Sequence, residues 1–190
     1  MLSHKRIVLA VLADSHVPER MHCIPDSLFE SLRYYDVTGI IHAGDITSVH
    51  VLSQLERIAP VIAVRGNRDI WTSAGRSLPL SFVLKMGGVQ IGITHGHGGF
   101  WSYIWEKCLY YSIGFSYNRY YQRLCRQFSD NINIIVFGHT HRIVKKWFKN
   151  TLYFNPGSVG PVYYDTNVPT FGIIEIDDGI ISTRIVKISK

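Results

Sequence analysis

Five short clusters of polar residues constrain this chain more than any other feature, because each one follows an apolar segment that is typical of a β-strand. The clusters are Asp14-Ser15-His16, Gly44-Asp45, Gly66-Asn67-Arg68-Asp69, His95-Gly96-His97 and Gly138-His139-Thr140-His141. In open α/β sheets the loops that follow the carboxyl ends of the strands gather to form a ligand crevice. We therefore expect these five clusters to converge on one site.

The order of the apolar segments predicts an α/β fold with two β-sheets packed face to face and helices outside. The first half alternates strands and helices, and the second half is rich in hairpins. We expect strands at 6–13, 39–42, 61–64 and 132–137, helices at 26–35 and from Thr47 or Ser48 to Pro60, and hairpins at 82–94, 144–154 and 171–188.

The composition is that of one globular domain spanning residues 1–190. Hydrophobic residues make up 46% of the chain, and a chain of this size buries about 70% of its unfolded surface. The longest strictly apolar run is Ile7 to Ala13, far below the roughly 18 residues of a membrane-spanning helix. Disordered and transmembrane classes are therefore excluded.

Charge and cysteine content bound the partners and the compartment. Lys and Arg number 20 against 14 Asp and Glu, and this excess favours anionic partners such as phosphates, nucleic acids or acidic lipid headgroups. The three cysteines form no CxxC pair, which suits a reducing cytosol better than a disulfide framework. We expect a cytoplasmic protein.

One aromatic segment stands apart from the rest. Ten of the 22 residues from Phe100 to Tyr121 are aromatic, within a helical insertion expected at about 99–129. The plainest interpretation is a helix that covers a sheet. The alternatives are an oligomer interface, a lid over the site or a surface for an apolar substrate. Because large apolar patches are rarely left exposed, we expect a homo-oligomer formed through this helix.

The residue types in the five clusters predict a metal centre. Asp, Asn and His supply the oxygen and nitrogen donors of borderline and hard divalent cations. If the segments are extended, Asp14 and His16 point to the same face, and so do His139 and His141. The carboxylate of Asp45 is able to bridge two metals. We expect two divalent ions, Mn²⁺ in the first place, with Zn²⁺, Fe²⁺ or Ni²⁺ as alternatives.

The order DxH, GD, GNxD, HGH and GHxH resembles that of the calcineurin-like metallophosphoesterases. Asn155-Pro156-Gly157-Ser158 is similar to the NPGS turn of the small phosphodiesterase subfamily. The resemblance implies a four-layer αββα sandwich of two mixed sheets and a dinuclear metal centre. It also implies that the turn shapes and packs the site.

The resemblance further implies a role for each cluster residue. One metal would be held by Asp14, His16 and His141, the other by Asn67, His95 and His139, with Asp45 bridging both. Asp69 would orient a neighbouring ligand or water through a hydrogen bond. His97 would support a metal ligand from behind or touch the substrate.

The expected activity is hydrolysis of a small or nucleotide-like phosphodiester. The positive charge of two divalent ions exceeds the negative charge of the Asp14 and Asp45 carboxylates, so the centre would be positive and would attract a phosphate. A water that bridges two metals has its pKa lowered to about 7. The hydroxide would attack phosphorus in line. Many family members have His where this chain has Arg68. Because arginine binds phosphate but hardly donates a proton, we expect Arg68 to clamp the phosphate and His97 to be a candidate acid.

Three other functions remain open. The motif GNRD also resembles that of UDP-diacylglucosamine hydrolases, which cleave the pyrophosphate of a lipid-linked nucleotide sugar. Some members of the superfamily have lost metal ligands and are non-catalytic scaffolds, whereas this chain keeps all seven expected positions. The basic residues between Arg119 and Lys149 would suit nucleic acid, although a solvated face explains them better.

Overall fold

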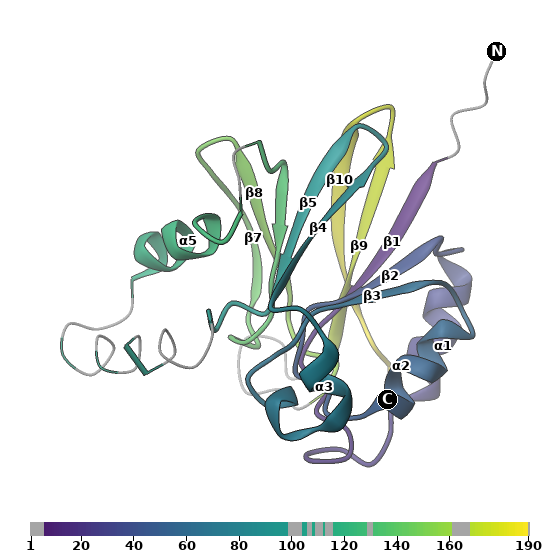
Figure 1. Ribbon diagram of the computed structural model, residues 1–190. Helices are drawn as coiled ribbons and strands as arrows, with labels where there is room; N and C mark the ends of the chain where they lie inside the picture. The colour runs from purple at the N-terminus through teal and green to yellow at the C-terminus, as the bar shows by residue number, and fades with distance from the viewer. Residues whose placement is uncertain are drawn as a thin grey trace.

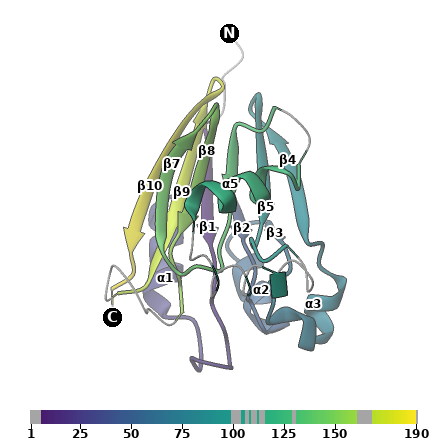
Figure 2. The same ribbon diagram turned by 90° about the vertical axis from the view of Figure 1, so that its left-hand side faces the viewer.

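Two five-stranded β-sheets pack face to face and carry helices on their outer surfaces, as Figure 1 shows. This computed structural model describes residues 6–98, 104, 105, 108, 112, 116–128, 131–160 and 168–189. Figure 2, turned by 90°, shows one sheet in front of the other, with the loops that follow several strands at the lower end of both.

The first sheet joins the start of the chain to its end, in the order β10-β9-β1-β2-β3. Its strands are β1 (Ile7–Leu12), β2 (Gly39–His42), β3 (Val61–Ala63), β9 (Thr170–Asp177) and β10 (Ile180–Lys187). The three N-terminal strands run parallel, whereas β9 pairs antiparallel with β1. The sheet is therefore mixed.

The second sheet is built from the middle of the chain, in the order β4-β5-β6-β8-β7. Its strands are β4 (Ser81–Met86), β5 (Val89–Thr94), β6 (Ile134–Val136), β7 (Ile143–Phe148) and β8 (Thr151–Pro156). Here β5, β6 and β8 are parallel, and each edge strand, β4 and β7, is the antiparallel arm of a hairpin.

The helices complete four layers. Helices α1 (Asp26–Tyr34) and α2 (Val49–Glu56) bury their apolar faces on the outside of the first sheet, and α5 (Tyr117–Cys125) covers the outside of the second. A separate apolar cluster, which includes Val11 and Ile93, fills the space between the sheets. The expected αββα sandwich is confirmed.

Most expected elements lie within two or three residues of their predicted bounds. Ser48 caps α2, because its Oγ accepts a hydrogen bond from the His50 N–H at 3.2 Å. Two short elements were not predicted: the 3₁₀ turn η1 (Asp69–Trp71) and helix α3 (Ser73–Ser77). Helix α3 has no apolar periodicity, and its start is defined by Thr72, whose Oγ1 accepts from the Gly75 N–H at 3.0 Å.

The aromatic segment is described only in part. Its C-terminal portion includes α5, whose Tyr120, Tyr121 and Leu124 are buried against the second sheet. Most of 99–115 lies outside the described residues, so the expected interface, lid and oligomer stay predictions. Among the described helices, none is long and apolar enough to cross a membrane.

Candidate metal centre

The five polar clusters meet at one end of the sandwich, beyond the carboxyl ends of β1, β2, β3, β5 and β6. Backbone hydrogen bonds tie the loops together: the Asp14 N–H donates to the Gly44 carbonyl at 3.0 Å, and the His16 N–H donates to the Asp45 carbonyl at 3.0 Å. The His139 N–H donates to Asp14 Oδ2 at 3.1 Å. Loops from both sheets thus share one set of contacts.

The segments that carry the clustered side chains are not extended, contrary to the expectation for Asp14-x-His16 and His139-x-His141. Strand β1 ends at Leu12 and β6 at Val136. The two residues of each pair, and Asp45 as well, have left-handed backbone angles, with φ between 51° for His16 and 71° for His139. The side chains converge because each loop turns sharply, at a cost of about 1 kcal/mol or more per residue.

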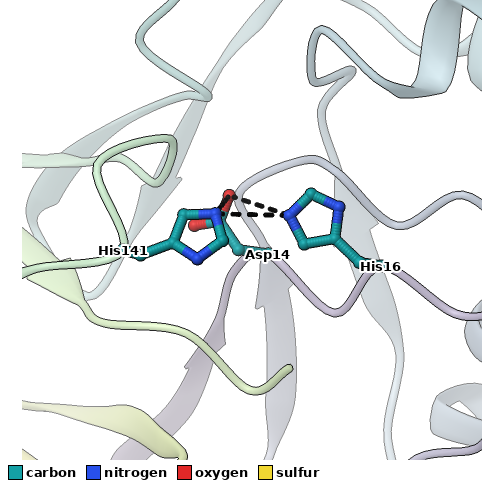
Figure 3. Close-up of side chains that lie close together, drawn as sticks. All are labelled: Asp14, His16 and His141. Carbon is teal, nitrogen blue, oxygen red and sulfur yellow. Dashed lines mark hydrogen bonds and ion pairs between the residues drawn. The ribbon is translucent and has the colours of Figure 1, made fainter. Parts of the chain in front are cut away.

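One group of donor atoms combines side chains that are 125 residues apart in the chain. His141 Nε2 lies 3.4 Å from Asp14 Oδ1 and 3.3 Å from His16 Nε2. His16 Nε2 lies 3.9 Å from the same Asp14 oxygen. Figure 3 shows the three side chains pointing toward one another, with His141 on a loop of the second sheet and the other two on the loop after β1.

A second group of donor atoms lies beside the first. Asn67 Oδ1 is 3.1 Å from His95 Nε2 and 2.9 Å from His139 Nδ1. The other ring nitrogen of His95, Nδ1, lies 2.7 Å from the Ala43 carbonyl. That contact orients the ring so that Nε2 faces the group.

The carboxylate of Asp45 lies between the two groups. Its Oδ2 is 3.7 Å from His16 Nε2 and 3.4 Å from His95 Nε2. Its Oδ1 accepts a hydrogen bond from the Arg68 N–H at 2.8 Å. Gly66 makes this position possible, because a Cβ there would lie within about 2.1 Å of Asp45 Oδ1.

The spacing of these donors fits bound divalent ions. Ligand bonds of about 2.1 Å place neighbouring donors roughly 3.0 Å apart in octahedral and 3.4 Å apart in tetrahedral geometry. In each of two overlapping sets, Asp14 with His16 and His141 and Asp14 with Asp45 and His95, the donor atoms all lie within 4.8 Å of one another. The sets share Asp14, and the second contains Asp45 in place of the expected Asn67 and His139. The residues present therefore fit two neighbouring cations.

In the protein alone, the titratable groups of this cluster have strongly shifted pKa values. Burial raises the pKa of Asp14 to about 8, and the nearby Asp45 charge adds to the effect. Burial would also raise the pKa of Asp45, but the charge and hydrogen bond of His95 outweigh it and hold that pKa below its usual range. Burial opposes protonation of His95, yet Asp45 raises the pKa of that imidazole to about 9.

The surrounding imidazoles are held neutral. Burial, with a smaller contribution from neighbouring positive charges, lowers the pKa of His16 and of His97 to about 4. It also lowers the pKa of His139. A neutral imidazole has a free lone pair, which is the state that a metal ligand requires.

Asp69 lies beneath the loops rather than among the donors. Its Oδ1 accepts hydrogen bonds from the N–H groups of Ile46 and Thr47, at 2.9 and 2.7 Å. Its Oδ2 accepts from the N–H groups of Asp45 and Gly66, at 2.9 and 2.8 Å. One buried carboxylate thus joins the loop after β2 to the loop after β3.

Arg68 and His97 occupy different environments. The Arg68 guanidinium is about one-third exposed and lies 3.2 Å from Glu19 Oε1. His97 is buried, with its ring centroid 5.4 Å from that of His95. Among the described residues, neither ring nitrogen of His97 has a hydrogen-bond partner.

The NPGS turn contacts the site from the side. Asn155 Nδ2 donates to the Gly138 carbonyl at 2.9 Å and to Thr140 Oγ1 at 3.1 Å. Ser158 Oγ donates to the Asp14 carbonyl at 2.9 Å. These bonds support the loops that carry Asp14 and His139.

Two residues near the site were not singled out from the sequence. His42 is fully buried at the end of β2, with Nε2 3.1 Å from Ser15 Oγ, and its pKa is lowered to about 3 by burial and by the charge of His95. Glu19 contacts Arg68 and His16. A histidine at the end of the otherwise apolar strand GIIH could have pointed to His42. Nothing in the local sequence points to Glu19, whose place becomes clear only in the folded loop.

Comparison with known proteins agrees with this geometry. The calcineurin-like phosphoesterase superfamily domain matches residues 7–179. A curated relative from Methanothermobacter thermautotrophicus, named "Probable metallophosphoesterase", is 28% identical over 181 residues, or 95% of this chain and 92% of its own length.

Solved structures share the fold. A Vps29 from Entamoeba histolytica in complex with Zn²⁺ has a TM-score of 0.70 at 24% identity, covering 96% of this chain and 100% of its own. A solution structure from Thermotoga maritima has a TM-score of 0.66 at 28% identity, covering 95% and 99%. With the family domain spanning nearly the whole sandwich, this chain belongs to the calcineurin-like phosphoesterase superfamily.

Proposed function

We propose that this protein is a metal-dependent phosphodiesterase that hydrolyses a small or nucleotide-like phosphodiester in the cytoplasm. The observation that carries the proposal is the position of the Asp45 carboxylate, with Oδ2 within 3.7 Å of His16 Nε2 and 3.4 Å of His95 Nε2. A carboxylate between two sets of donors is the arrangement that a pair of divalent cations requires. The three cysteines are unpaired and exposed, which supports a reducing compartment.

In this proposal seven side chains hold two cations, Mn²⁺ in the first place. One site comprises Asp14, His16 and His141, the other comprises Asn67, His95 and His139, and Asp45 belongs to both. The donors are nitrogens and oxygens without a thiolate, a set that suits Mn²⁺, Fe²⁺, Ni²⁺ and Zn²⁺. Bound there, two cations would polarise a phosphoryl group and lower the pKa of a water molecule.

The side chains of the chain itself supply binding and orientation. Arg68 has its backbone bonded to Asp45 and its guanidinium at the edge of the site, so its planar fork binds the phosphate rather than protonating the leaving group. His97 faces the second donor group from the buried side. Because its pKa is lowered to about 4, its imidazole is neutral near pH 7 and a weak proton donor, which argues against the acid role expected for it and favours a hydrogen-bonding role. Asp69 keeps the Asp45 loop in place through its four backbone hydrogen bonds.

A non-catalytic scaffold is the second candidate. Structures of Vps29 are among the similar folds, and one of them, from Chaetomium thermophilum, is in complex with a cyclic peptide. The complete set of donors in this chain favours hydrolysis, but a Vps29 structure also contains Zn²⁺, so turnover rather than metal binding separates the two candidates.

Hydrolysis of a bis-aryl phosphodiester tests the proposal. Protein stripped with a chelator and reloaded with Mn²⁺ should cleave the diester, and Asp45→Ala should lower kcat/KM by about 10³-fold or more, because it removes a ligand shared by both cations. Arg68→Ala should raise KM, since the phosphate loses a bidentate partner.

The outcomes separate the alternatives. Metal-dependent turnover that disappears in Asp45→Ala supports the dinuclear phosphodiesterase. Two bound ions without turnover of the diester would favour a specialised substrate, such as the pyrophosphate of a lipid-linked nucleotide sugar. No bound metal and no turnover would favour the scaffold.

A further inference from the structure

A glutamate outside the five clusters lies at the mouth of the candidate centre. Glu19 is on the loop that leads from β1 to α1, and its side chain is about one-third exposed. Its Oε1 lies 3.2 Å from Arg68 Nη1, and its Oε2 lies 3.8 Å from His16 Nδ1. One carboxylate therefore faces both the phosphate-binding arginine and a candidate metal ligand.

The contact with His16 involves the ring nitrogen that points away from the metal donors. Nε2 of His16 faces Asp14, Asp45 and His141, whereas Nδ1 is buried and has no hydrogen-bond partner among the described residues. A metal ligand of this kind carries its proton on the second nitrogen, where a carboxylate commonly receives it. Glu19 is the acidic group nearest to that proton.

The contact with Arg68 changes the charge that an incoming phosphate meets. Arginine has five N–H donors, and the carboxylate of Glu19, which lies 3.2 Å from Nη1, has only two oxygens, so donors remain for a phosphate. The pair has no net charge. It therefore offers hydrogen bonds to a phosphate without the additional attraction of an unpaired cation.

That difference discriminates between phosphate classes. A phosphate monoester carries two negative charges above its second pKa of about 6, whereas a phosphodiester carries one. A fixed carboxylate repels a dianion twice as strongly as a monoanion at the same distance. A neutral Glu19–Arg68 pair therefore disfavours monoesters relative to diesters.

We propose that Glu19 is a specificity-determining residue, which positions Arg68 at the mouth of the site and selects monoanionic phosphodiesters against dianionic phosphates. The inference rests on the proposed phosphodiesterase function and assigns to one residue the choice of substrate class.

The test compares Glu19→Gln with wild type, both loaded with Mn²⁺, at a pH of about 8, where the monoester is a dianion. The ratio of kcat/KM for a bis-aryl diester to that for the matching aryl monoester should fall by about fivefold or more, because one repulsive charge is lost. The dissociation constant for inorganic sulfate, an unreactive dianion, measured by titration calorimetry, should fall as well. Glu19→Asp, which keeps the charge, should retain most of the wild-type ratio.

Glu30→Gln is the matched control, since it removes an exposed carboxylate from α1 and should change neither readout. A ratio and a sulfate affinity that are the same in Glu19→Gln and wild type would overturn the proposal. Sulfate binding needs no turnover. If the wild type hydrolyses neither ester, the proposed function fails, while the sulfate comparison still decides the role of Glu19.

Discussion

Single residues in strained or buried positions give this site its character. Asp14, His16, Asp45, His139 and His141 all have a positive φ, which costs an ordinary residue about 1 kcal/mol or more. Such strain persists only where surrounding bonds over-determine the backbone. The four hydrogen bonds to Asp69 and the bond from Ser158 to the Asp14 carbonyl are examples of that support.

The lowered pKa of His42, buried beneath the site, can be tested through the pH dependence of stability. Its folded-state pKa is about 3, against an ordinary value of about 6.5, so the folded protein binds fewer protons than the unfolded chain between these values. The free energy of unfolding of the metal-free protein should therefore fall as the pH drops below about 6.5, with a contribution from His42 approaching 1.4 kcal/mol per pH unit. Urea denaturation at several pH values measures this slope.

The control variant is His42→Gln, which does not titrate but keeps a polar group facing Ser15. Its free energy of unfolding should fall less steeply with acid than that of the wild type. The raised pKa of Asp14 gives a slope of the opposite sign, but that residue is common to both proteins. Equal slopes in the two proteins would contradict a neutral, buried His42.

At the scale of elements, α5 forms the fourth layer of the sandwich. Leu124 is fully buried between this helix and the second sheet, together with Tyr120 and Tyr121. Tyr121 packs on Tyr153 of β8 at a ring-centroid distance of 4.6 Å. The helix thus covers one face of the sheet that carries His95 and His139.

Leu124→Ala should destabilise the protein by about 2–5 kcal/mol, because it leaves a cavity in a packed layer. Gln122→Ala, an exposed position on the same helix, should change stability by about 0.5 kcal/mol or less. Urea denaturation of the two variants measures the difference. Similar stabilities would show that α5 does not pack on the sheet in solution.

At the scale of the whole molecule, cations should link the two halves of the sandwich. Asp14 and Asp45 follow strands of the first sheet, whereas His95, His139 and His141 follow strands of the second. These candidate donors from the two sheets lie close together only in the folded protein. A cation that binds the folded form alone stabilises it by about 2.7 kcal/mol at a hundredfold excess over its dissociation constant.

Thermal unfolding should therefore shift upward as Mn²⁺ is added to chelator-treated protein, and back when the chelator is restored. Asp45→Ala should lose most of the shift, since it removes a donor near both groups. A melting temperature that is the same with and without Mn²⁺ in the wild type would argue against a cation at this site.

Much of the architecture was predictable because strands and helices leave periodic apolar patterns. The buried run of β1, the apolar positions of α2 and the hairpin at Gly87-Gly88 all lie where the sequence placed them. Helix α3 was missed because five residues with a cap at Thr72 leave no such pattern. Local hydrogen bonds alone produce an element of that size.

Residue types and their order after each strand are local information, so the sequence was enough to predict a cluster of metal-binding residue types and the end of the sheets at which it lies. Tertiary structure alone decided how the donors meet. The left-handed turns at Asp14 and His139, the position of Asp45 between two groups and the contact of Glu19 with Arg68 depend on loops that lie far apart in the chain. Such contacts are set by packing and hydrogen bonds between loops, which leave no periodic signal in a single sequence.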